Sequence, residues 1–329
     1  MPTRQKNKLN VIVIGSVSST LRTIEGLLRN RIKISGILGY EPTASNNVSG
    51  FVDLKKIASK NDIDYLGFDK INDKENLIWA KEKNPDVIFA VGFSQLISDE
   101  WLSLPLLGCI GFHPTCLPKG RGRAPLAWIV LDKGCGSATY FLMDSGADSG
   151  PIFTQEKFIV SDIDDALSVS KKIEKSIDVA LDKWLPMLAS GVWNPKPQTE
   201  LKSSEYGRRM PEDGVIIWGE PAVAIDRLVK ASTTPHPRAF TFLGNEKVFI
   251  TSSLVESKIS IKGVVGRVLK NDNIKGSLIQ CGNGLLWING IFDSSDASIS
   301  PRVGERFGFY CELEIYRLWK KIKELEDGK

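Results

Sequence analysis

The chain has 329 residues, which is long enough for two domains that each bury a core without disulfides or metals. With 42% hydrophobic and 25% charged residues, it has the composition of a globular protein, which excludes a disordered or fibrous chain. A formal net charge of +4 spread along the chain gives little support to a large nucleic-acid partner, and no apolar run is long enough to cross a membrane.

The first half of the chain alternates between strand-like and helix-like segments. Residues 9–15, LNVIVIG, form a continuous apolar run that is typical of a parallel strand buried on both faces. A helix follows over 21–28, after serines and threonines at 16–20 that can cap it. Further strands are expected at 34–40, 65–68 and 86–93, and helices near 52–61 and 74–83. This order predicts an α/β fold, with a Rossmann-like, mostly parallel sheet and helices on both faces.

The carboxyl-terminal part has a different pattern. A long amphipathic helix that ends before Gly191 and Pro195 carries its apolar stripe at Val169, Ile173, Ile177, Leu181 and Trp184. Residues 194–206 are then typical of a linker. One short helix at 221–232 and several short strands separated by glycine turns predict a small, mostly β, OB-like barrel. We therefore expect two domains, 1–193 and 206–329.

The cysteines give an odd count with no CxxC spacing, which argues against a disulfide framework and against a zinc site. The five are Cys109, Cys116, Cys135, Cys281 and Cys311. We expect no bound metal, and a cytoplasmic location fits this cysteine usage best.

Residues 109–128, CIGFHPTCLPKGRGRAPLAW, place a histidine and three cations just after a buried strand. Ligands bind beyond the carboxyl ends of parallel strands, and prolines stiffen the loop on which we expect His113 to lie. A lone histidine is often structural, but this position favours a functional role. Lys119, Arg121 and Arg123 are either a solvated surface or, given the glycines between them, a site for an anionic group such as phosphate.

A second cluster, ATYFLMDSGADSGPI at 138–152, runs from an expected strand into a glycine-rich turn. The turn contains Asp144 and Asp148. Aspartates in such turns are usually turn formers, so this segment alone predicts no site.

Together the two clusters resemble the folate-dependent formyltransferases, which carry N-x-H-P-S-L-L-P, R-G-x-x-P and M-D-x-x-x-D-x-G-P motifs. The matching text here is GFHPTCLP, RGRAP and MDSGADSGP. PDVIFAVGFSQLI at 85–97 is similar to the family's folate loop, and RRMPEDGVIIW and PHPRAF to its carboxyl-terminal region. The extended first motif resembles a subgroup associated with bacterial surface sugars, the sugar N-formyltransferases.

The resemblance implies a reaction in which N10-formyltetrahydrofolate gives its formyl group to the amine of a nucleotide-linked amino sugar. His113 would act as general base or acid and Asp148 would orient it. The folate-binding residues implied are Phe93, Ser94, Gln95, Leu96, Ile97, Leu142, Met143 and Asp144. For the acceptor, the three cations of the first cluster would pair with a diphosphate, and Ser18 would add a donor at a helix start. Thr139 is a candidate to hold water or substrate, or a plain β-branched strand residue.

One departure from the family pattern concerns Gly111, which stands where the family has its asparagine. That asparagine would stabilise the oxyanion of the tetrahedral intermediate, a contribution of about 2.7 to 4 kcal/mol where such a donor is removed elsewhere. We expect another donor to substitute for it.

Three alternatives stay open. The chain could be a methionyl-tRNA formyltransferase, a catalytically impaired binding homologue, or a hydrolase of formyl-folate. The net charge favours a small nucleotide sugar over tRNA, which would demand basic surface on both domains. The family also implies a homodimer formed through the second domain.

Overall fold

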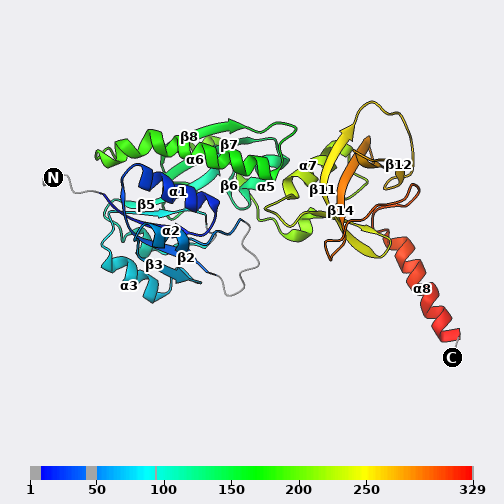
Figure 1. Cartoon of the computed structure of the whole chain (residues 1–329), viewed down its shortest axis with the longest axis horizontal. Helices are drawn as coiled ribbons and strands as arrows, with labels where there is room; N and C mark the ends of the chain where they lie inside the picture. Colours follow the sequence, from blue (N-terminus) through cyan, green and yellow to red (C-terminus); the bar gives the residue numbers. More distant parts are fainter. Residues whose placement is uncertain (1–8, 42–49, 93–94, 328–329) are drawn as a thin grey trace. The chain divides into compact units, whose positions relative to one another are not determined.

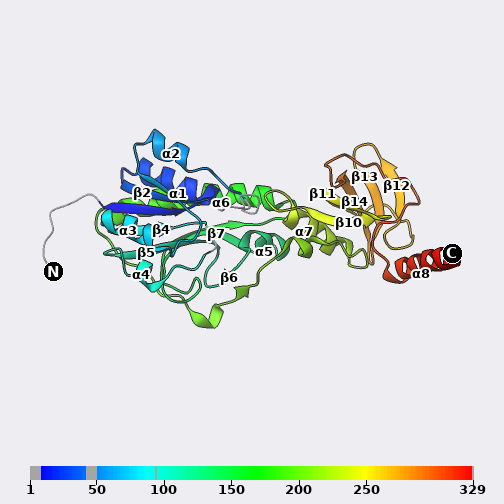
Figure 2. The same cartoon turned by 90° about the horizontal axis from the view of Figure 1, so that it is seen from below.

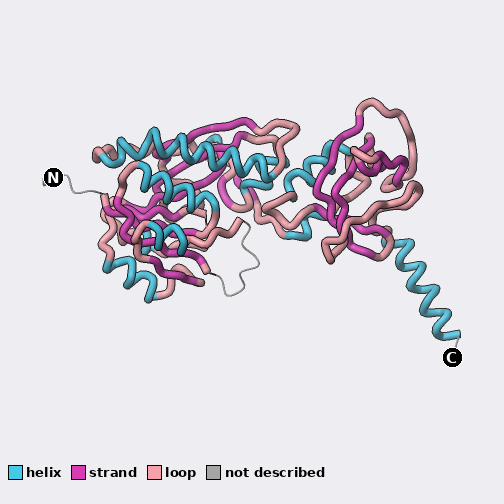
Figure 3. Tube along the Cα trace, viewed as in Figure 1, coloured by secondary structure: helices cyan, strands magenta, loops and turns pink. Residues whose placement is uncertain are grey.

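The computed structural model describes residues 9–41, 50–92 and 95–327. Residue contacts divide the chain into two compact units, Met1–Arg209 and Met210–Lys329, and each has its own sheet. Figure 1 colours the elements along the chain, and Figure 3 separates helices from strands.

The first unit is built on a seven-stranded sheet in the order β3-β2-β1-β4-β5-β7-β8. Its strands are β1 (Asn10–Gly15), β2 (Lys33–Tyr40), β3 (Tyr65–Phe68), β4 (Val87–Ala90), β5 (Gly108–Thr115), β7 (Cys135–Leu142) and β8 (Ile152–Ile159). The first five run parallel, and β7 and β8 add two antiparallel strands at one side. The expected Rossmann-like, mostly parallel sheet is confirmed.

Helices cover both faces of this sheet (Figure 2). They are α1 (Ser18–Arg29), α2 (Lys55–Lys60), α3 (Lys74–Glu82), α4 (Asp99–Leu102), α5 (Pro125–Leu131) and α6 (Ala166–Ala189). On one face, Trp184 of α6 packs against the rings of Phe89 and Tyr140. On the other, Ile12 and Ile88 share a buried cluster with residues of α3 and α4. Successive residues of β4 thus point to opposite faces, which is why this strand is a continuous apolar run.

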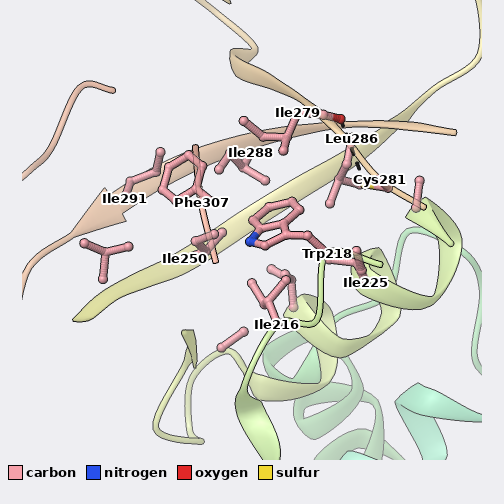
Figure 4. Close-up of a cluster of buried hydrophobic side chains, with 14 of the residues drawn as sticks. Ile216, Trp218, Ile225, Ile250, Ile279, Cys281, Leu286, Ile288, Ile291 and Phe307 are labelled. Carbon is pink, nitrogen blue, oxygen red and sulfur yellow. Dashed lines mark hydrogen bonds between the residues drawn. The ribbon is translucent and has the colours of Figure 1, made fainter. Parts of the chain in front are cut away.

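The second unit is a five-stranded antiparallel sheet with one packed helix, as expected for the OB-like barrel. Its elements are α7 (Ala222–Ser232), β10 (Ala239–Leu243), β11 (Glu246–Glu256), β12 (Val268–Asp272), β13 (Gly276–Gln280) and β14 (Leu285–Phe292). Arg306 and Phe307 bridge back to Arg267 and Leu243, at the two edges of the sheet, and so close it. Trp218 and Phe307 lie at the centre of its buried core (Figure 4).

A further helix, α8 (Cys311–Asp327), follows the barrel and was not anticipated. Residues 194–206 also differ from the expected linker, because they are joined to the first unit. Lys196 pairs with Ile152, and β9 (Glu205–Tyr206) pairs with β6 (Arg121–Gly122). Two 3-10 helices, Glu200–Lys202 and Pro211–Gly214, lie on either side of β9.

Cys116 and Cys135 form a disulfide across a separation of 19 residues, with their Cα atoms 5.8 Å apart. The argument from the odd cysteine count was therefore wrong for this pair. Whether two cysteines can bond depends on the distance and direction of their Cβ atoms, which the fold sets and the total number does not. Within the described residues, no helix combines the length and the apolar character needed to cross a bilayer.

Candidate active site

His113 lies in β5, close to the end of the strand, and not on a loop as we expected. The parallel partner β4 ends beside Gly111, and beyond this point β5 continues by antiparallel pairing with β7 alone. In this extension His113 lies opposite Thr139. Pro114 has no N–H to give to the ladder, and the register shifts between His113 and Thr115, where it sits.

Both ring nitrogens of His113 face protein groups. Nε2 lies 2.7 Å from the carbonyl oxygen of Gly120, and Nδ1 lies 3.4 Å from Oδ2 of Asp148. A carbonyl only accepts, so Nε2 carries the proton. The residue is 5% exposed, so the imidazole has little contact with solvent in this structure.

Burial lowers the pKa of His113 below its ordinary value of 6.5, and this effect outweighs the opposing pull of Asp148 and of the Gly120 carbonyl. The neutral imidazole is therefore the favoured form near neutral pH. A neutral ring with a nearby carboxylate can take up a proton and be stabilised once charged, which is what a general base requires.

Asp148 joins the second cluster to the first. Its backbone is in the left-handed region, with φ of 53°, and its Oδ2 accepts the N–H of Gly122 at 2.9 Å. The side-chain amide of Gln198 donates to the carbonyl of Asp148 at 2.8 Å and so holds the turn from a third segment. Asp144, four residues earlier, has a different environment: it is exposed and closes the turn by accepting from Gly146 and Ser149.

The three cations of the first cluster have different surroundings. Arg121 is buried and pairs with Glu200 at 2.7 Å, while its guanidinium also donates to Gln198 at 3.0 Å. Lys119 and Arg123 are exposed. A ligand would have to displace Glu200 to reach Arg121, whereas the other two side chains stand in solvent.

The remaining acceptor candidates occupy two places. Thr139 is fully buried, and its hydroxyl donates to the carbonyl of Thr115 at 2.7 Å and accepts from Gln155 at 3.2 Å. Ser18 is the first residue of α1 and half-buried. The cap of this helix comes from Thr20, whose hydroxyl lies 3.2 Å from the N–H of Val17, and not from the serines.

The expected folate-binding segments converge on one hydrophobic cluster, against which Ile97 and Met143 both pack. Gln95 is fixed by the N–H of Ile71 at 2.8 Å, and Leu96 is 85% exposed. The N–H groups of Leu142 and Met143 already donate to carbonyls within the protein. Phe93 and Ser94 lie outside the described residues, and Asp144 is the exposed turn residue described above.

Gly111 lies directly opposite Phe141 in the β5–β7 ladder. A Cβ atom on Gly111 would lie 2.6 Å from Cζ of Phe141 and 3.0 Å from Cγ of Met143. The aromatic ring therefore covers the glycine and fills the space that a side chain at position 111 would need.

Sequence reasoning missed Gln198 and Glu200, which hold the turn of Asp148 and the guanidinium of Arg121. Both lie in the segment that was read as a linker, and no motif singled them out. No group of histidines, cysteines and carboxylates suited to a metal ion occurs within the described part of the chain.

Comparison with known proteins agrees with this architecture. The formyl transferase family profile matches residues 8–183, and the profile for the formyl transferase carboxyl-terminal domain matches residues 209–301. The two profiles cover most of the chain, and the first alone covers more than half of it.

Several solved structures share the fold at low sequence identity. WlaRD, a sugar 3N-formyl transferase solved with dTDP and 5-N-formyl-THF, has 16% identity and a TM-score of 0.63 over 88% of this chain and 100% of its own. The N-formyltransferase from Helicobacter canadensis, in complex with folinic acid and dTDP-3-aminofucose, has 15% identity and a TM-score of 0.65 over 86% of this chain and 100% of its own. HypX from Aquifex aeolicus, bound to tetrahydrofolic acid, has 17% identity and a TM-score of 0.63 over 88% of this chain, which spans only 45% of HypX.

At these identities the solved structures show the fold alone, and the profile matches show the family. The chain belongs to the formyl transferase family.

Proposed function

We propose that this protein transfers the formyl group of N10-formyltetrahydrofolate to the amine of a nucleotide-linked amino sugar. The observation that carries the proposal is the buried imidazole of His113 beside the carboxylate of Asp148, at the end of a parallel sheet. WlaRD and the Helicobacter canadensis enzyme, which share the fold, were solved with dTDP or a dTDP-sugar and with a formylated folate. We assign the catalytic role to the first unit, in which the expected domain 1–193 is extended by the paired segment up to Arg209, and we take Met210–Lys329 as the carboxyl-terminal domain.

In the proposed reaction the amine nitrogen bonds to the formyl carbon and the bond from that carbon to N10 breaks. His113 takes up the proton that the amine loses and returns a proton to N10, while Asp148 stabilises the charged ring between these steps. For this exchange the Nε2 hydrogen bond to Gly120 has to open and the ring proton has to move to Nδ1, beside Asp148, so that Nε2 is free to accept the amine proton. Gly120 has φ of 71° and Gly122 has φ of 97°, so the loop that carries the carbonyl depends on glycine at both positions.

The folate ring is proposed to lie against the cluster that includes Ile97 and Met143, within reach of the backbone of residues 95–97 and 142–144. For the acceptor, Lys119 and Arg123 offer exposed charge to a diphosphate. Arg121 is assigned a positioning role through Glu200, because its guanidinium is already paired and buried. Thr139 is assigned the same kind of role, since its hydroxyl is enclosed by protein groups.

The test measures formyl transfer from N10-formyltetrahydrofolate to a panel of dTDP- and UDP-linked amino sugars and, separately, to methionyl-tRNA. His113→Asn and Asp148→Asn proteins are expected to lose activity by a factor of about a thousand or more, in line with other histidine–carboxylate pairs. Glu156→Gln is the matched control: it removes a carboxylate from β8 of the same sheet that pairs with Lys183 and to which no role in the reaction is assigned.

The outcomes separate the alternatives. Transfer to methionyl-tRNA but to no sugar would show that the acceptor is a tRNA and not a nucleotide sugar. Formate release without any acceptor would indicate a hydrolase. Parent-like activity in the His113 or Asp148 variant would remove that residue from the mechanism, and an inert parent protein with intact folate binding would indicate an impaired homologue.

A further inference from the structure

The helix α8 exposes an apolar face that none of the described residues covers. None of its 17 residues is buried. Seven large apolar side chains on it are between 44% and 65% exposed: Leu313, Ile315, Tyr316, Leu318, Trp319, Ile322 and Leu325. An exposed apolar cluster of this size on one short element marks an interaction surface. The family profile for the carboxyl-terminal domain ends at residue 301, so α8 lies beyond the matched region.

The spacing of these residues is that of a coiled coil. Ile315 and Ile322 are seven residues apart, and Leu318 and Leu325 repeat the interval three residues later. The result is isoleucine at both a positions and leucine at both d positions of a heptad repeat. In parallel coiled coils, β-branched residues at a with leucine at d favour two helices over three or four. We call the stripe formed by these four residues the seam. Its spacing indicates that the partner is another helix, and its residue types indicate a pair of helices.

The charges beside the seam fit a second copy of the same helix. In a parallel pair, the g position of one helix faces the next e position of the other. Lys321 at g would face Glu326 at e of the partner, and by symmetry the pair occurs twice. The ion pairs within the helix, Glu314 with Arg317 and Lys320 with Glu324, leave Lys321 and Glu326 out.

We propose that α8 pairs with α8 of a second copy of this chain as a parallel, two-stranded coiled coil. A helix of 17 residues is marginally stable alone in water, so burial of the seam would also stabilise the helix itself. The barrel anchors its start, because the Tyr310 hydroxyl donates to the carbonyls of Val265 and Phe307 and the Glu314 N–H donates to the carbonyl of Tyr310. The proposal is independent of the reaction proposed above.

An anionic membrane surface fits this face less well. The helix carries four cations, Arg317, Lys320, Lys321 and Lys323, and five carboxylates, Glu312, Glu314, Glu324, Glu326 and Asp327, which gives a net charge of 4 − 5 = −1. Helices that lie on anionic lipid usually have an excess of lysine and arginine.

Cys311 provides a test of helix direction. It lies at the d position before Ile315, and it is an exposed free thiol. In a parallel pair the two Cys311 side chains meet at the seam. In an antiparallel pair they would lie at opposite ends, about 24 Å apart at 1.5 Å per residue. Burial raises the pKa of the other two free thiols, Cys109 and Cys281, to about 12, so mild oxidation reaches Cys311 selectively.

The experiment uses the full chain and measures its mass by light scattering after size exclusion. The parent protein is expected to have twice the monomer mass, and Ile315→Lys/Ile322→Lys to have the monomer mass. Leu313→Lys/Tyr316→Lys is the matched control, because it adds the same charge to apolar positions off the seam and should remain a dimer. Oxidation of the parent should give a covalent dimer on a non-reducing gel, and Cys311→Ser should not.

Four results would overturn the proposal. They are a monomeric parent, a dimer that survives the seam variant, a control variant that becomes monomeric, and a dimer that Cys311 does not cross-link. Sedimentation of the parent, but not of the seam variant, with phosphatidylglycerol vesicles while both remain monomeric would instead assign this face to a lipid surface.

Discussion

The surroundings of Gly111 predict that Gly111→Asn, which introduces the asparagine expected from the family motif, destabilises the protein. Gly111 is buried, and its missing side chain makes room for the ring of Phe141 across the β5–β7 ladder. A Cβ at position 111 would lie 2.6 Å from that ring, closer than real Cβ atoms approach other heavy atoms. Gly111→Asn therefore requires Phe141 to move.

We expect Gly111→Asn to lower the free energy of unfolding by about 1–3 kcal/mol, the usual cost of overpacking a core. An amide that finds no partner there would add about 1–3 kcal/mol more. Formyl transfer should not improve, because the asparagine cannot take up its family geometry while the ring is in place.

The control is a double-mutant cycle measured by urea denaturation. Phe141→Leu alone leaves a cavity and is destabilising. In its background the asparagine has space, so the double variant should be more stable than the sum of the single effects by 1 kcal/mol or more. A Gly111→Asn protein as stable as the parent, or strictly additive effects, would show that the ring does not exclude a side chain at position 111.

Four further predictions concern the same region. Since burial lowers the pKa of His113, kcat/KM should fall with decreasing pH only below 6.5, and Asp148→Asn should shift that fall to still lower pH because the carboxylate raises the pKa. The same pKa shift should reduce the free energy of unfolding as the pH decreases from 6.5 toward the pKa of His113 in the folded protein, because the unfolded chain binds the proton first. The difference in stability between the parent and a His113 variant should therefore change between pH 7 and pH 5.5, and an unchanged difference would contradict the prediction. Cys116→Ser/Cys135→Ser should lower stability by about 2–4 kcal/mol, which denaturation of the parent with and without reductant checks independently. Arg121→Gln should weaken activity mainly through kcat, because the residue positions the loop; an effect confined to the KM for the nucleotide sugar would instead indicate direct contact with the ligand.

Most of the fold could be predicted from local patterns of apolar residues in the sequence. The strand Asn10–Gly15 and the stripe of α6 were predictable because their apolar residues are the ones that the fold buries. The helix α8 was missed although its spacing is helical, since it follows a run of short strands and its apolar face is not buried by any residue that the structure describes. Residues 194–206 were misread because their proline and polar composition is that of a linker, while their contacts to β6 and β8 are non-local.

Only the site residues that lie within the two sequence clusters could be predicted from the sequence. Two clusters separated by some 30 residues were expected to meet, and the described structure brings His113 and Asp148 together. The contact between Gly111 and Phe141 could not be read from the sequence, because it depends on the register of the antiparallel β5–β7 ladder. A shift of one residue in either strand would place a different side chain over the glycine.

The enclosure of His113 decides how the proposed chemistry can begin. A ring that is 5% exposed and has protein groups at both nitrogens cannot accept a proton from a substrate until one contact opens. The Nε2 bond to Gly120 is a neutral hydrogen bond, and opening one of these costs about 0.5–1.5 kcal/mol net when a new partner replaces it. Opening the Asp148 contact would remove the carboxylate that stabilises the charged ring, at the step where that charge forms. The cheaper path is therefore movement of the glycine-rich loop away from Nε2, together with a shift of the ring proton to Nδ1 beside Asp148. This movement would couple the proposed acceptor binding near Lys119 and Arg123 to exposure of the base.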